Sequence, residues 1–99
     1  MYIIERINSK ANGELTLDFK FGTHYTTLQE ANEECKRYLE WYGKHSKKLN
    51  KKVGEYLIIV DSNNNYRNCW YLFNNEIDYV RANSFSEVQW FAYSMANWE

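Results

Sequence analysis

The stretch that most constrains the fold runs from Thr27 to about Lys52, where apolar residues recur every three or four positions. The apolar positions are Leu28, Ala31, Cys35, Tyr38, Leu39, Tyr42 and Leu49. This spacing lines one face of a helix, so the stretch predicts a single long amphipathic helix. Thr27 and Glu30 have the spacing of a capping box at its start. A helix that is apolar on one face needs a second layer to cover that face.

Alternating segments on either side of this helix predict a sheet. In residues 14–21, four apolar side chains alternate with polar ones, which predicts a strand with one covered face. These four are Leu15, Leu17, Phe19 and Phe21. The apolar run 56–60 has no polar residue and therefore predicts a central strand that is covered on both faces. The remaining strands are predicted at segments 2–7, 66–73 and 76–81. A final helix is predicted to begin with Ser86 as its cap, with Gln89 three residues later, and to end near Trp98.

The predicted elements follow the order β-β-α-β-β-β-α. Their connections are short, and short connections favour hairpins. We therefore expect one α+β domain over residues 1–99, with an antiparallel sheet of four to five strands and both helices on one face. Ninety-nine residues can bury a modest core without a metal or a disulfide. Cys35 and Cys69 both fall in patterned elements, and no signal-peptide or membrane-span pattern is present, so we expect reduced thiols in a cytoplasmic protein.

The search for catalytic and metal-binding patterns is negative. The two histidines, His24 and His45, do not stand at metal-ligand spacing with a cysteine or a carboxylate. The chain has four glycines and no glycine-rich phosphate motif. The sequence therefore predicts a protein without enzymatic activity, without a metal and without a cofactor.

Basic charge is concentrated around the middle of the chain, in residues 44–52, although the net charge is −1. We call the cluster the lysine ridge, and it consists of Lys44, Lys47, Lys48, Lys51 and Lys52. One interpretation is a solvated helix face whose lysines match the helix dipole. The other is an anion-binding surface for nucleic acid, a nucleotide or an acidic protein surface.

Two tryptophans fall outside the predicted apolar stripes. Trp41 lies off the stripe of the long helix, among Arg37, Lys44, His45 and Lys48. It can be a cation–π partner within its own helix, a stacking platform for a base or an interface anchor. In the last helix, Trp90 and Tyr93 lie on the side opposite the core stripe, and a helix with two apolar faces is buried on both or awaits a partner.

These features predict a small binding protein that occludes a surface on a larger protein. The expected contact residues are Arg37, Trp41, Lys44, Lys48, Trp90 and Tyr93. The residue types with AT-rich codons are abundant, so the specific form we expect is a phage or mobile-element inhibitor of a bacterial defence system, with an anti-CRISPR-like role in the host cytoplasm. Two alternatives stay open: a nucleic-acid-binding module that uses the lysine ridge and Trp41, and a nucleotide-sequestering homo-oligomer. A homodimer or higher oligomer is compatible with each, and no membrane partner is expected.

Overall fold

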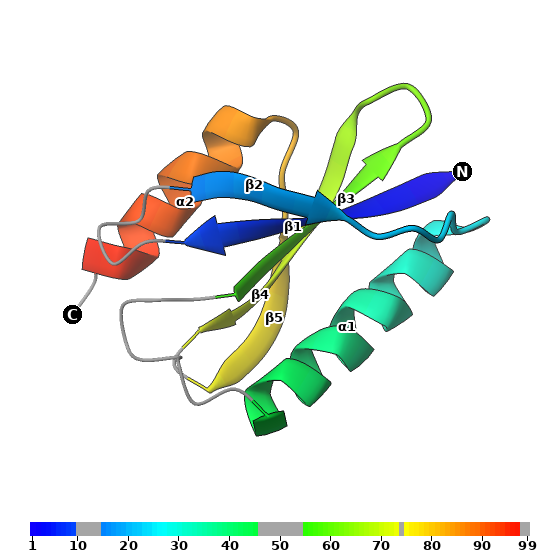
Figure 1. Cartoon of the computed structure of the whole chain (residues 1–99). Coiled ribbons are helices and arrows are strands. Elements are labelled where there is room, and N and C mark those ends of the chain that lie inside the picture. Colours follow the sequence, from blue (N-terminus) through cyan, green and yellow to red (C-terminus); the bar gives the residue numbers. More distant parts are fainter. Residues whose placement is uncertain (10–14, 46–54, 74, 98–99) are drawn as a thin grey trace.

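The computed structural model describes residues 1–9, 15–45, 55–73 and 75–97, which form one five-stranded sheet and two helices (Figure 1). The elements are β1 (Tyr2–Ser9), β2 (Leu15–Lys20), α1 (Leu28–His45), β3 (Glu55–Asp61), β4 (Tyr66–Phe73), β5 (Glu76–Arg81) and α2 (Phe85–Asn97). All neighbouring strands are antiparallel, in the order β2-β1-β3-β4-β5. The α+β class, the antiparallel sheet and the element order are therefore confirmed. The predicted Asn12-Gly13 turn and the part of the long helix after residue 45 lie outside the described residues.

The central strand β3 is buried on both faces, as its unbroken apolar run predicts. Leu57 and Ile59 belong to one core cluster, and Ile58 and Val60 belong to the other. Successive strand residues point to opposite faces of a sheet, so the two clusters lie on its two sides.

The two helices lie on opposite faces of the sheet, one over each cluster (Figure 1). Helix α1 contributes Ala31, Cys35 and Leu39 to the cluster of Leu57 and Ile59. Helix α2 contributes Val88 and Ala92 to the other cluster. The expectation that both helices share one face is therefore wrong. A sheet whose central strand is apolar on both sides needs cover on both sides, and each helix supplies one layer.

Strand β2 contains a β-bulge that reverses its alternation. Ile7 pairs with Leu17 and Arg6 pairs with Phe19, so Asp18 is the extra residue. Because residues that pair across two strands share a face, Leu17 lies on the α2 side with Ile7, and Phe19 lies on the α1 side with Arg6. The expectation that the four apolar residues of segment 14–21 share one covered face is wrong. Leu15 is buried in the α2-side cluster and Phe21 packs against the α1-side cluster, whereas Leu17 and Phe19 are about half exposed.

Hydrogen bonds cap both helices at their first turns. The Thr27 hydroxyl oxygen accepts the Glu30 N–H at 3.1 Å, which confirms Thr27 as the cap of α1. The Glu30 carboxylate accepts the Thr27 hydroxyl at 3.2 Å. Helix α2 is capped two residues earlier than predicted, because Ser84 Oγ accepts the Glu87 N–H at 3.2 Å and Glu87 accepts the Asn83 N–H. The side chain of Gln89 has another partner: its carbonyl oxygen accepts the Leu15 N–H at 3.0 Å and so ties α2 to β2.

The placement of α1 gives a matched test on one helix. Leu39 is fully buried in the α1-side cluster, while Trp41 is 55% exposed. Leu39→Ala should lower the free energy of unfolding by about 2–5 kcal/mol, because it removes buried methyl groups and leaves a cavity. Trp41→Ala should cost less than about 1 kcal/mol, as expected of an exposed site. Urea denaturation of both variants measures the difference, and equal losses would contradict the placement of this helix face.

Candidate functional site

A row of contacting rings crosses from β2 to α1, and we call it the aromatic row. It consists of Phe19, Phe21, Tyr38 and Trp41. The ring centroids of Phe19 and Phe21 are 5.7 Å apart, those of Phe21 and Tyr38 are 5.3 Å apart, and those of Tyr38 and Trp41 are 6.1 Å apart. These separations suit stacked and edge-to-face contacts. The middle rings are half-buried, while Phe19 at one end is 45% exposed and Trp41 at the other is 55% exposed.

Trp41 is held by its own helix. Its ring stacks on that of His45, one turn later, with centroids 5.1 Å apart and planes 22° apart. The His45 Nδ1 lies 2.9 Å from the Trp41 carbonyl oxygen, which fixes the imidazole beside the indole. Arg37 instead donates to Glu34 at 2.7 Å. The intramolecular ring partners of Trp41 among the described residues are therefore Tyr38 and His45, and these contacts leave more than half of the indole exposed.

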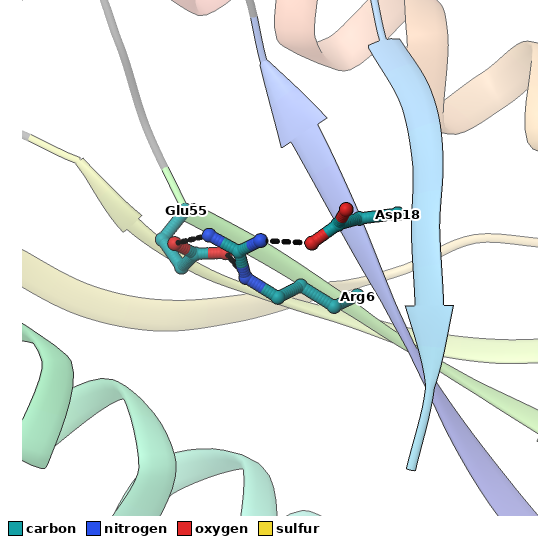
Figure 2. Close-up of polar contacts among 3 residues, drawn as sticks. All are labelled: Arg6, Asp18 and Glu55. Carbon is teal, nitrogen blue, oxygen red and sulfur yellow. Dashed lines mark hydrogen bonds and ion pairs between the residues drawn. The ribbon is translucent and has the colours of Figure 1, made fainter.

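Figure 2 shows a cluster of three charged side chains, Arg6, Asp18 and Glu55. The cluster lies beside the aromatic row, because Arg6 packs against Phe19. Arg6 on β1 donates from Nη2 to Glu55 Oε2 at 2.8 Å, and its Nε lies 2.6 Å from Glu55 Oε1. Glu55 is at the start of β3, so this two-point contact joins neighbouring strands. The Nη1 of Arg6 donates to Asp18, the extra residue of the bulge in β2. One guanidinium therefore connects three strands.

Two aromatic rings pack against the same guanidinium. The Cζ atom of Arg6 lies 5.6 Å from the ring centroid of Phe19 and 5.7 Å from that of Tyr42. Both distances are within the range of cation–π attraction. Phe19 comes from β2 and Tyr42 from α1, so Arg6 helps to hold the exposed edge strand next to the helix.

Burial sets the electrostatics of this cluster. Glu55 is 2% exposed, and burial raises the pKa of its carboxyl against the opposing effect of Arg6. Burial disfavours the charge on Arg6, but the contacts with Glu55 and Asp18 raise its pKa, so the guanidinium stays charged. Arg6 donates to both Glu55 and Asp18, while its Nε and the Glu55 Oε1 lie at ion-pair distance without a hydrogen bond. The cluster thus has the features of a positioning element rather than of an acid–base site.

The predicted contact residues fall on two separate surfaces. Arg37, Trp41 and Lys44 lie on α1, and Trp90 and Tyr93 lie on α2, on the other face of the sheet. Trp90 is 72% exposed and Tyr93 is 43% exposed. The structure therefore leaves both predicted tryptophans exposed, but it does not bring them together. Four residues of the lysine ridge lie outside the described residues, namely Lys47, Lys48, Lys51 and Lys52.

Sequence reasoning missed Phe19 and the charged cluster. In the alternating pattern Phe19 occupies a position that faces the same side as Leu17. Only the bulge at Asp18 places the two side chains on opposite faces of the sheet. A signal for Arg6 was present, since it has the same parity as the buried Ile4 on β1. A charged residue at a core-facing position predicts a buried partner of opposite charge.

The described residues offer little for covalent or metal chemistry. No group of three or more His, Cys, Asp and Glu residues among them is placed to hold a metal ion. Burial raises the pKa of the Cys35 thiol, and it raises that of Cys69 to about 12, so neither is a thiolate near neutral pH. Both thiols are free and buried, as expected. No helix in the described ranges is long and apolar enough to span a membrane.

The charged cluster predicts a strong coupling between two substitutions. Arg6→Met leaves Glu55 buried without its cation, and Glu55→Leu leaves Arg6 without its main partner. Each single change should lower the free energy of unfolding by about 3–5 kcal/mol, while the double variant should lose far less than the sum, because no uncompensated buried charge remains. Urea denaturation of the three variants gives the coupling. Simple addition of the two losses would show that the contact between Arg6 and Glu55 is not a coupled pair.

The chain was compared with protein-family models, with characterised proteins and with solved structures, and none of them matched it.

Proposed function

We propose that this chain is a small non-enzymatic binding protein that covers a surface of a larger protein with its aromatic row. The observation that carries the proposal is the exposure of Trp41, which ends a row of contacting rings and is 55% exposed. Tryptophan is among the residues that contribute most to binding energy at protein interfaces. A ring already held in place by neighbours also loses little conformational freedom when a partner binds.

The shape of the row supports binding at this place rather than elsewhere on the sheet. Tyr38 and Phe21 hold Trp41 and Phe19 in one continuous apolar strip across two elements. Arg6 fixes the β2 end of the strip through its contacts with Phe19 and Asp18. Such preorganised aromatic side chains are typical of interface anchors.

The role in a phage or mobile element, as an inhibitor of a bacterial defence system, is one specific form of this function. It depends on the composition of the sequence, and the geometry of the row is equally compatible with other protein partners. The α2 surface with Trp90 is a separate region, so it serves as an internal control for the proposal.

A capture experiment with two matched variants tests the proposed function. Immobilised wild-type protein is incubated with bacterial lysate, and bound proteins are identified by mass spectrometry beside Trp41→Ala and Trp90→Ala. A partner that is retained by wild type and by Trp90→Ala, but is reduced at least about tenfold by Trp41→Ala, is the expected result, since loss of an interface anchor costs about 1.4 kcal/mol or more. Thermal unfolding of all three proteins checks that the variants remain folded.

The pattern of loss decides the outcome. Loss with Trp90→Ala alone would move the contact to α2 and overturn the assignment to the aromatic row. Sedimentation of the free protein over a range of concentrations should also show a monomer whose mass does not depend on Trp41. A dimer that Trp41→Ala dissociates would make the row a self-association surface instead.

A further inference from the structure

We infer that the aromatic row takes a short acidic segment of a partner, with one apolar side chain seated on Trp41 and carboxylates beside it. The inference rests on the proposed function and adds the chemistry of the partner. It follows from the charges around Trp41 and from the size of the exposed apolar surface.

The charges next to Trp41 on the helix are basic. Residues three or four positions away are neighbours on a helix surface. For Trp41 these are Arg37, Tyr38, Lys44 and His45, and none of them is acidic. Arg37 and Lys44 are exposed, and the described residues give Lys44 no acidic partner within ion-pair distance. Because Arg37 is bonded to Glu34, Lys44 is the cation that carboxylates placed beside the indole would meet without a competing acid among the described residues.

Apart from Lys36, the basic residues of α1 lie in its second half, which also contains one acid, Glu40. Glu30, Glu33 and Glu34 occupy the first half of the helix, and Glu34 is bonded to Arg37. A long polyanion that followed the helix axis would therefore run from cations into carboxylates. Two or three carboxylates next to the indole avoid this repulsion. The charge pattern thus favours a short acidic stretch of protein over a nucleic-acid strand.

The exposed ends of the aromatic row offer a small apolar area. Phe19 and Trp41 are 45% and 55% exposed, so together they offer on the order of 200 Å². A stable protein–protein interface covers about 800 Å² on each partner. The row is therefore of a size to seat one or two side chains, as a short segment would provide.

A peptide selection tests the class of partner without assuming a sequence. A displayed library of random twelve-residue peptides is selected on immobilised wild-type protein and depleted on Trp41→Ala. Peptides enriched in Asp and Glu around a Leu, Phe or Trp are the expected result. Enrichment of Lys and Arg, of uncharged peptides, or of nothing beyond the Trp41→Ala background would overturn the inference.

Nuclear magnetic resonance then locates the contact. The best selected peptide is titrated into ¹⁵N-labelled protein, and the indole N–H signals are followed. The Trp41 signal should shift, while two controls should stay in place: Trp70, whose indole donates to Asn32 at 2.9 Å, and Trp90 on the opposite face. Shifts confined to Trp90 would contradict the assignment to the row.

Charge reversals separate the role of the cations from that of the ring. Lys44→Glu should weaken peptide binding at least tenfold, because it places a carboxylate beside the indole. The matched control is Lys36→Glu, an exposed position about 140° around the helix from Trp41; it should change binding less than twofold. Equal effects of the two reversals would show that binding responds to the overall charge of the protein and not to Lys44 in particular, which would overturn the inference.

A hexathymidylate probe, titrated at two salt concentrations, covers the nucleic-acid alternative. If this probe binds at Trp41 in a salt-sensitive manner and no acidic peptides are selected, the partner is a nucleic acid and not a protein segment, which overturns the inference. The proposed function fails separately from this inference. If a captured protein depends on Trp41 but acidic peptides do not bind, the binding function stands and only the chemistry of the partner is wrong.

Discussion

The contact between Arg6, Glu55 and Asp18 is the constraint on which the α1 side of the sheet depends. It joins three strands through one guanidinium, and Glu55 is almost completely buried. Removing both charges from water is costly, so such a cluster adds less to stability than its short distances imply. Its main effect is on geometry. Because Asp18 is the bulge residue, the same guanidinium holds β2 at the point where its alternation reverses.

The reversal creates the aromatic row. In an unbulged strand, Phe19 would share a face with Leu17, on the side of the sheet that α2 covers. With the bulge, Phe19 lies on the α1 side, where its ring stacks on Phe21, which in turn contacts Tyr38 of α1. One extra residue in an edge strand therefore moves an apolar side chain from one layer of the protein to the other. The surface that we propose for binding is thus a consequence of a local irregularity that bends the strand, as bulges commonly do near functional sites.

Sequence patterns predicted the features of the fold that depend on interactions between residues close in sequence. The three-four spacing identified Ala31, Cys35 and Leu39 as the buried face of α1, and Thr27 as its cap. The side on which each helix packs depends on contacts between distant segments, and the pattern of α2 is the same on either face of the sheet. The predicted cap of α2 was Ser86, but Ser84 has the same three-residue spacing to Glu87, and the structure uses Ser84 as the cap.

The same division holds for the candidate site. The exposure of Trp41 and Trp90 follows from helical periodicity alone, so the sequence was enough to find them. Their separation by the sheet, and the association of Trp41 with Phe19, depend on tertiary structure. The bulge residue Asp18 is ion-paired with Arg6, twelve positions away, and no periodic pattern within β2 contains that information.

The two buried cysteines mark the two layers separately. Cys35 lies in the cluster under α1, and Cys69 lies in the cluster under α2. Since each thiol is shielded until its own layer opens, its rate of alkylation reports the local opening of that layer. The chain thus carries a natural pair of reporters, which can show whether the two faces of the sheet come apart together or one before the other.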